Sequence, residues 1–171
     1  MKLTQPDWPR RLPAKFVTAV ATLGPLGRKL PAPGTWGSLA GLLYVLVFFR
    51  HLNARETLAV TAIAAYLAVG LTGEAARRLG RTDPGEVILD EFVVMPLVFL
   101  GWRFGPGGVW PEWVGLLAGF GLFRFYDILK PLGIKRLQSW PDGWGIVVDD
   151  IAAAFAACAT LHLGAWLWTL R

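Results

Sequence analysis

The chain has 171 residues, of which 54% are hydrophobic and only 17% charged, and its formal net charge is +5. Soluble domains carry about 25% charged residues, so this composition argues against a soluble globular enzyme and against a disordered chain. One cysteine and two widely spaced histidines exclude a disulfide framework and a Cys-rich zinc site, and basic charge on so apolar a chain favours a membrane surface over nucleic acid as a partner.

The length favours a single domain over residues 1–171, with residues 1–30 as a cytoplasmic or interfacial segment. That segment is basic, but Pro6, Pro9 and Pro13 interrupt it, and no apolar stretch typical of a signal peptide follows. We therefore expect no cleavable signal peptide.

Residues 31–49 contain no ionisable charge, and their apolar part begins near Trp36. Prolines keep the approach to this part extended, and Thr35 is a suitable N-cap, with Ser38 three residues later. Exposed N–H groups at the start of a helix attract anions. Thr35 and Ser38 are therefore candidate anion-binding residues.

Four further apolar segments predict an all-α fold, a compact membrane-integrated bundle of about five or six helices. These segments are residues 57–73, 92–102, 109–123 and 151–170. Only the last has the roughly 20 residues that a spanning helix needs, so we expect several short or partly spanning segments. The alternative interpretation is that the segments are buried core helices.

If all five segments cross a membrane, the charged residues gather on one side of it. Thirteen lysines and arginines fall on the side that carries the N-terminus and four on the other, so the first side should be cytoplasmic. Ten of the twelve acidic residues also fall there. The polar chemistry is therefore expected at the cytoplasmic face.

The first acidic groups on this face lie between residues 83 and 91. Asp83 and Glu86 spell D-x-x-E around Pro84, which predicts a capping box at the start of a helix. Asp90 and Glu91 lie between apolar runs. Because neighbours on a helix point about 100° apart, at least one of the two should face the interior. A buried carboxylate near a membrane is a candidate functional residue, because burying it without a partner is costly.

A second acidic pair, Asp149 and Asp150, precedes the last apolar segment, where its alternative role is to cap a helix. Asp127 lies between the two pairs. Arg124 and Lys130 flank it at a spacing of three residues, which places all three on one helical face. Such a face can bind phosphate beside a carboxylate, although an ordinary surface ion pair has the same spacing. Five carboxylates without a neighbouring histidine or cysteine suit Mg²⁺ or Mn²⁺.

Four stretches carry a family resemblance by their order and spacing. They are PGTWGSL at residues 33–39, VILDEF at 87–92, FRFYDILKP at 123–131 and GWGIVVDDI at 143–151. Together they resemble the phosphatidylglycerophosphatase A family. This resemblance implies a small all-α bundle in the bacterial inner membrane, which removes the terminal phosphate of phosphatidylglycerophosphate with Mg²⁺ as cofactor. The chain departs from the family at Asp142, where a glycine is usual, and over residues 103–111.

The gathering of carboxylates beside Arg124 and Lys130 suggests a mechanism with expected roles for the site residues. The expected metal ligands are Asp90, Glu91, Asp149 and Asp150. The expected contacts to substrate phosphate are Thr35, Ser38, Arg124 and Lys130. Asp127 is expected to orient the attacking water or to act as general base, with Asp90 and Asp149 as further catalytic residues. An aspartyl-phosphate intermediate is an alternative.

Two other functions remain open at this point. One is a non-enzymatic membrane scaffold or transporter with an acidic core, which predicts that the acids pair with arginine or lysine inside the bundle. The other is a Mg²⁺-dependent phosphatase or transferase that acts on another phospholipid. The sequence predicts membrane lipids as partners and no nucleic acid, and it makes no prediction of the oligomeric state.

Overall fold

The computed structural model describes residues 3–105 and 107–171, and these form helices joined by turns and loops, with no strand among them. The all-α prediction is confirmed. The elements in chain order are η1 (Trp8–Arg11), α1 (Ala14–Ala21), α2 (Pro25–Lys29), α3 (Pro33–Tyr44), η2 (Val45–Phe49), α4 (Ala54–Leu79), α5 (Leu89–Val98), α6 (Glu112–Leu129), η3 (Ile134–Ser139) and α7 (Gly143–Thr169).

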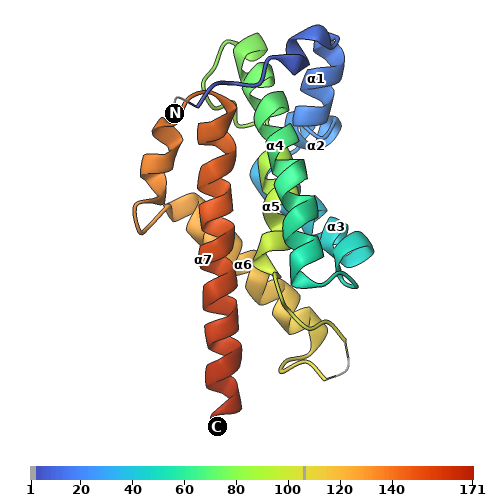
Figure 1. The fold of residues 1–171 in the computed structure, drawn as a ribbon, viewed down its shortest axis with the longest axis vertical. Coiled ribbons are helices and arrows are strands. Elements are labelled where there is room, and N and C mark those ends of the chain that lie inside the picture. The colour runs from blue at the N-terminus through green and yellow to red at the C-terminus, as the bar shows by residue number, and fades with distance from the viewer. Residues whose placement is uncertain (1–2, 106) are drawn as a thin grey trace.

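Helix α5 lies at the centre of the bundle. Eight of its ten residues are buried. It packs mainly on α3, α4 and α7, and α7 also packs along α6 (Figure 1). A helix that is apolar on all sides is stable only when neighbours cover all of it. The acidic residues in the first turn of α5 therefore lie inside the protein.

A row of glycines on α3 lets this helix approach α5 closely. A Cβ atom at Gly37 would lie 2.9 Å from the Cβ of Ile88. One at Gly41 would lie 2.8 Å from the Cβ of Met95 and 2.9 Å from the carbonyl oxygen of Phe92. No side chain fits in these spaces, so the backbone of α3 rests directly on α5. This contact brings the first turns of the two helices together.

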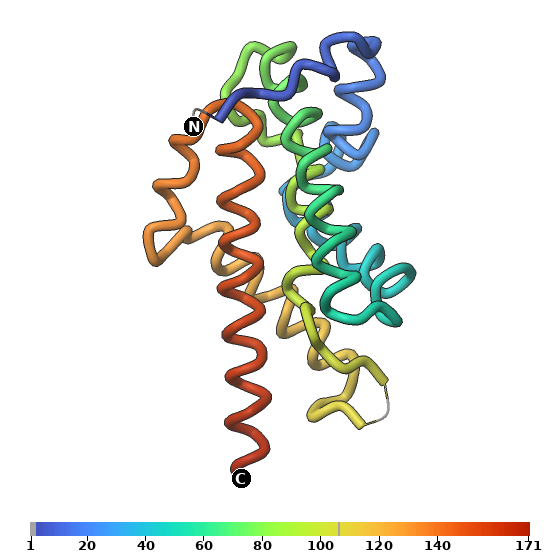
Figure 2. Tube along the Cα trace, in the orientation of Figure 1, coloured from blue at the N-terminus to red at the C-terminus, as the bar shows by residue number. Residues whose placement is uncertain are grey.

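Within the described residues, only α4 and α7 are long and apolar enough to cross a membrane. The lengths agree with the expectation of short or partly spanning segments, and they do not support the case in which all five apolar segments cross. Helix α5 has ten residues, roughly 15 Å at 1.5 Å per residue, and the hydrocarbon core is about 30 Å thick. The last turns of α7 project beyond the other helices (Figure 2), and they expose Trp166, Leu167 and Trp168. This exposed apolar surface is typical of membrane association.

The predicted capping box at Asp83 and Glu86 is wrong, because residues 83–88 form no helix. Their chain is a loop, in which the N–H of Val87 bonds to the carbonyl of Pro84 at 2.8 Å. Glu86 instead forms an ion pair with Arg81. The proline therefore initiates a turn here, and α5 begins only at Leu89.

The alternative role of Asp149 and Asp150 as helix caps is also excluded. Helix α7 begins at Gly143, so both residues lie beyond its first turn, where the backbone N–H groups already have helical partners. Residue Asp142 occupies the cap position of this helix, without a side-chain hydrogen bond to it. The aspartate pair therefore requires another explanation.

Candidate active site

Three carboxylates from two helices meet inside the bundle. Asp90 and Glu91 lie in the first turn of α5, and Asp150 lies in α7. One oxygen atom from each of the three lies within 4.8 Å of the other two. Asp90 and Asp150 are only 6% and 3% exposed. We call these three residues the acidic cluster.

Oxygen atoms of the acidic cluster are buried without a hydrogen-bond partner in the described part of the chain. They include Oδ1 of Asp90 and Oε2 of Glu91. Leaving a buried carboxylate oxygen unpaired is costly, and native proteins rarely do so. A cation between the three side chains would satisfy these atoms. Because all the donors are carboxylate oxygens, the residues fit Mg²⁺.

The protonation of the cluster follows from its burial. Burial raises the pKa of Asp90 well above its usual range, and the neighbouring charge of Glu91 raises it further. Burial also raises the pKa of Glu91, with further increases from the charges of Asp150 and Asp127, while Arg124 opposes them. Like charges in one buried site resist joint ionisation, and a nearby cation favours it.

Arg124 of α6 connects the acidic cluster to α3. Its Nη1 lies 2.6 Å from Oδ2 of Asp127, 3.3 Å from the hydroxyl of Ser38 and 3.7 Å from Oε1 of Glu91. Its Nε is buried without a partner in the described residues. The guanidinium therefore has donor capacity left over beside the cluster. That arrangement suits the binding of a phosphate oxygen.

Lys130 connects the two remaining aspartates. It follows the last residue of α6, with φ at 45°. Its Nζ donates to Oδ2 of Asp149 and lies 3.5 Å from Oδ1 of Asp127. Burial alone would lower the pKa of Lys130, but the hydrogen bond with Asp149 and the nearby aspartate charges raise it overall. Lys130 is therefore a cation at every pH of physiological interest.

Asp149 lies beside the acidic cluster rather than within it. One of its oxygens accepts from Lys130, and the other, Oδ1, is buried without a partner in the described chain. The predicted set of four metal ligands is thus arranged as the three cluster carboxylates and an adjacent Asp149–Lys130 pair.

The start of α3 lies against Glu91 and Arg124, and a Cβ atom at Gly34 would overlap Oε1 of Glu91. Thr35 is not the N-cap that the sequence predicted. The helix begins at Pro33, and Ala32 holds the cap position without a side-chain bond. Thr35 is half-buried in the first turn, and its N–H already bonds to the carbonyl of Ala32 at 2.9 Å. Its N–H is therefore not free to bind a substrate.

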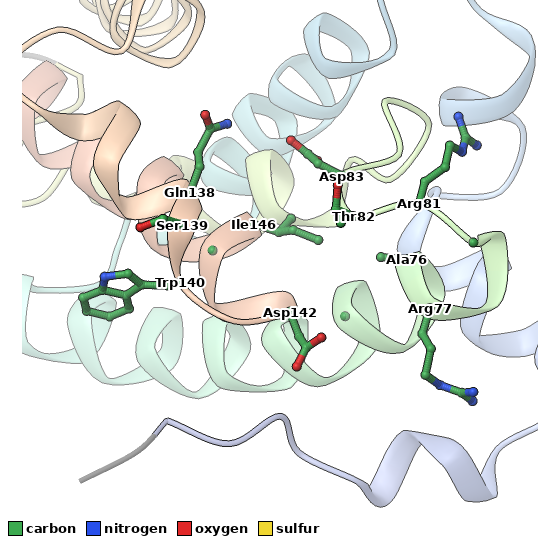
Figure 3. A pocket seen from close by; sticks show the side chains of 13 residues that line it. Ala76, Arg77, Arg81, Thr82, Asp83, Gln138, Ser139, Trp140, Asp142 and Ile146 are labelled. Atoms are coloured by element: carbon green, nitrogen blue, oxygen red, sulfur yellow. The ribbon is translucent and has the colours of Figure 1, made fainter.

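A cavity of about 690 Å³ lies at the end of the bundle where α4 ends and α7 begins (Figure 3). Its polar lining comes from α4, the loop after it, the end of η3 and the turn before α7. These residues are Arg77, Arg81, Thr82, Asp83, Gln138, Ser139 and Asp142. Gly145 and Ile146 also line it, one helical turn before Asp149 and Asp150. The cavity therefore lies next to the acidic cluster but does not contain its carboxylates.

Sequence reasoning missed residues that position the site. The glycines at 34, 37 and 41 recur at a helical spacing, which is a readable signal of close helix packing. Arg28 and Arg81 line surface cavities close to the start of α3. No spacing rule marks these two arginines, because the loop after α4 and the short helix α2 bring them together.

Known proteins resemble this chain over most of its length. A sequence model of the family described as phosphatidylglycerophosphatase A matches residues 19–165. A Haemophilus influenzae protein named phosphatidylglycerophosphatase A is 37% identical over 139 residues, covering 80% of this chain and 82% of that protein. An Escherichia coli K12 protein of the same name is 32% identical over 140 residues, covering 81% and 77%.

A third relative has a different name. A Bacteroides thetaiotaomicron protein, named as a candidate phosphatidylinositol-3-phosphatase, is 29% identical over 140 residues, covering 80% of this chain and 85% of that protein. No solved structure matches the chain significantly.

Proposed function

The chain belongs to the phosphatidylglycerophosphatase A family, and we propose that it hydrolyses phosphatidylglycerophosphate to phosphatidylglycerol and phosphate in a Mg²⁺-dependent reaction of phospholipid synthesis. Its class as a phosphatase follows from the family. One observation supports the metal dependence most directly. The acidic cluster combines three close carboxylates with buried oxygens that have no partner among the described residues.

We assign the Mg²⁺ site to Asp90, Glu91 and Asp150. When bound, Mg²⁺ neutralises phosphate charge and lowers the pKa of a coordinated water. Proteins usually hold this ion with one or two carboxylates and leave other positions to water and substrate phosphate. Three carboxylates are therefore sufficient, and the predicted fourth ligand, Asp149, is assigned a different role.

Arg124 and Lys130 are assigned to the oxygens of the terminal phosphate. Both side chains lie within hydrogen-bond or ion-pair distance of Asp127, which fixes their positions relative to each other. Two cations held in this way stabilise the charge of a transferring phosphoryl group. Asp127 then acts mainly by orienting Arg124 and Lys130, in place of the general-base role expected from the sequence.

Asp149 is the better placed general base. Lys130 fixes one of its oxygens, and the other is unpaired and next to the acidic cluster. In the hydrolysis, a water oxygen forms the new bond to phosphorus as its proton moves to Asp149. The bond between phosphorus and the glycerol oxygen breaks, and that oxygen takes up the proton that Asp149 accepted, which gives the alcohol of phosphatidylglycerol and restores the Asp149 carboxylate.

The site is assigned to the cytoplasmic face of the bacterial inner membrane, with α4 and α7 as the crossing helices. The end of α4, the loop after it and η3 carry Arg77, Arg78, Arg81, Lys135 and Arg136. The opposite ends of α4 and α7, with the loops beside them, carry the four basic residues Arg50, Arg55, Arg103 and Arg171, out of 17 in the chain. By the positive-inside rule, this charge asymmetry supports a cytoplasmic position for the acidic cluster.

Phosphate release from a panel of lipids tests the proposed substrate. The panel contains phosphatidylglycerophosphate, phosphatidylinositol 3-phosphate and phosphatidic acid in mixed micelles with Mg²⁺. We expect the highest kcat/KM on phosphatidylglycerophosphate. A higher kcat/KM on phosphatidylinositol 3-phosphate would overturn the substrate and favour the function in the name of the Bacteroides relative.

A further inference from the structure

Two hollows lie beside α2 and α3, one polar and one apolar, and we consider them together as the two parts of one groove. Its polar part has a volume of about 470 Å³, and the charged residues that line it are Arg28, Arg81 and Glu86. Its apolar part has a volume of about 400 Å³ and lies along α3. The residues of this part are Leu26, Trp36, Leu39, Ala40, Leu42, Leu43 and Leu46.

The two parts follow each other along the same helices. Gly27 of α2 lines the polar part, and its neighbour Leu26 lines the apolar part. On α3, Pro33 lines the polar part, and Trp36, one turn later, lines the apolar part. Residues that are close in sequence on both helices therefore line the two parts.

We propose that this groove binds the diacyl phospholipid substrate, with its phosphodiester at Arg28 and Arg81 and an acyl chain along the apolar part. This inference rests on the proposed function and adds to it. The proposed substrate has two phosphate groups, and the acidic cluster accounts only for the terminal one. The phosphodiester and the acyl chains need a separate binding surface.

The groove begins next to the active site. Pro33 lines its polar part, and the following residue, Gly34, packs against Glu91 and Arg124. The first turn of α3 thus separates the two regions. A three-carbon glycerol bridge joins the two phosphates of the substrate, so the phosphates would lie on either side of this turn.

The charge of the polar part is complementary to a phosphodiester. Two arginines and one glutamate give this part a net charge of one positive unit, and a phosphodiester carries one negative unit. Arg81 contacts Glu86 through Nη2, and a guanidinium has further N–H donors for an anion. Arg28 is exposed in the last turn of α2.

The direction of the groove matches the layers of a bilayer. Helix α3 follows α2, which lies toward the end of the molecule where α4 ends, and it runs obliquely away from that end (Figure 1). The arginines are therefore at the level of lipid headgroups, and Leu39, Leu43 and Leu46 are farther into the hydrocarbon layer. This order, from charge to apolar surface, is the order of groups in a phospholipid.

The phosphodiester subsite is tested by substrate selectivity. The substrates are deacylated phosphatidylglycerophosphate, which keeps both phosphates, and glycerol 3-phosphate, which has only a monoester. In the double variant Arg28→Gln/Arg81→Gln, we expect the kcat/KM ratio of the first to the second substrate to fall about tenfold, because charged hydrogen bonds are lost. The matched control is Lys29→Gln, which removes a neighbouring charge that does not line the groove. An equal fall in the control would overturn the assignment.

The acyl part is tested by comparing the diacyl lipid with its deacylated form. Leu43 and Val47 are exposed to similar extents, 63% and 58%, but only Leu43 lines the groove. We expect Leu43→Asn to raise KM for the diacyl lipid several-fold relative to the deacylated substrate, and Val47→Asn to leave that ratio near the wild-type value. Equal ratios in the two variants would contradict an acyl-binding groove.

A binding measurement separates this inference from the proposed activity. Phosphatidylglycerol keeps the phosphodiester and acyl chains but has no terminal phosphate. We expect its retention by the purified protein, measured by native mass spectrometry, to fall in Arg28→Gln/Arg81→Gln and not in Lys29→Gln. If wild-type protein retains this lipid but hydrolyses no substrate, the proposed function fails and the groove stands. If retention is equal in all variants, the groove assignment fails.

Discussion

Asp90 and Glu91 are adjacent in sequence but have different neighbours in the fold. Glu91 lies against Gly34 of α3 and within 3.7 Å of Arg124. Asp90 has no basic partner among the described residues, and one of its oxygens is unpaired. The two positions differ because neighbouring side chains on a helix diverge by about 100°. A scaffold with an acidic core would pair every acid, so Asp90 favours a metal site instead.

The raised pKa values of Asp90 and Glu91 predict how stability depends on pH. Between about pH 4, where an exposed carboxyl group ionises, and the raised pKa values, the folded state binds more protons than the unfolded state. Stability without Mg²⁺ should therefore fall as the pH rises through this range. Mg²⁺ must displace the same protons, so its stabilising effect should grow with pH.

Thermal unfolding in detergent, at pH 5 to 8 with Mg²⁺ or EDTA, measures this effect. The difference in Tm between the two conditions should increase with pH in the wild type and lose most of its pH dependence in Asp90→Asn. A difference that is independent of pH in the wild type would show that the cluster carboxylates are not the groups that bind the ion.

The sequence could mark most residues of the candidate site, but it could not predict how they group in the fold. Local patterns mark several of these residues. Asp90 and Asp150 are acids beside apolar runs, and Asp127 has a basic residue three positions away. The pairing of Asp149 with Lys130 depends on how α6 and α7 cross. Because of that crossing, Asp149 pairs with Lys130 while its neighbour Asp150 belongs to the acidic cluster. From their spacing in the sequence alone, the two aspartates look equivalent.

At the scale of elements, the helices were predictable from long apolar runs, but their starts were not. The segment D-x-x-E at residues 83–86, which contains a proline, has the composition of a capping box, but it forms a turn. The reason is that α5 is buried and starts only where the chain enters the core. The cap at Asn53 and Glu56 has a genuine box geometry. The same sequence signal thus has two outcomes, and tertiary contacts decide between them.

The start of α7 is strained at Asp142. This residue has φ at 53° and ψ at −131°, a region that glycine adopts readily and other residues rarely do. Such strain costs about 1–3 kcal/mol. Asp142→Gly should therefore raise Tm in a thermal scan, by about 2–4 °C for each kcal/mol gained. Asp142→Ala keeps the strain and serves as the control. If Asp142→Ala stabilises as much as Asp142→Gly, the carboxylate is responsible and not the backbone.

The contact between α3 and α5 depends on the small size of Gly41. Its Cβ would lie 2.8 Å from Met95 and 2.9 Å from the carbonyl of Phe92, so Gly41→Ala should cost about 1–3 kcal/mol by overpacking. Gly121 in α6 has nothing within 4 Å of a Cβ. Gly121→Ala should therefore be stabilising by up to about 1 kcal/mol through helix propensity. The free energies of unfolding of both variants check this, and a neutral Gly41→Ala would mean that α3 and α5 are not in close contact.

Across the whole molecule, α4 and α7 run in opposite directions (Figure 1). Residues from the end of α4 or from the loop after it line both the cavity and the polar part of the groove. Five apolar segments allowed up to five crossings, but length limits α5, and Glu112, Arg124 and Asp127 make α6 polar at both ends. Apolar composition alone does not separate a spanning helix from a core helix, because both are buried away from water.

The orientation in the membrane is tested by labelling single cysteines in intact cells. Arg55→Cys lies at the start of α4 and Lys135→Cys in η3, both at exposed positions. An impermeant maleimide should label position 55 in cells with a permeabilised outer membrane, and position 135 only after the inner membrane is opened. The native Cys158 is buried and provides a low background. The reverse pattern would place the active site on the periplasmic side.

The proposal that the acidic cluster is the catalytic metal site is best tested by measuring phosphate release from phosphatidylglycerophosphate. Release is measured in mixed micelles, with Mg²⁺ or with EDTA. The proteins compared are wild type, Asp90→Asn, Asp150→Asn and the control Asp7→Asn, which removes an exposed acid outside the cluster. We predict release by wild type and Asp7→Asn only with Mg²⁺, and rates at least about 100-fold lower in the two cluster variants. Release by Asp90→Asn and Asp150→Asn at the wild-type rate, or undiminished release in EDTA, would contradict the assignment.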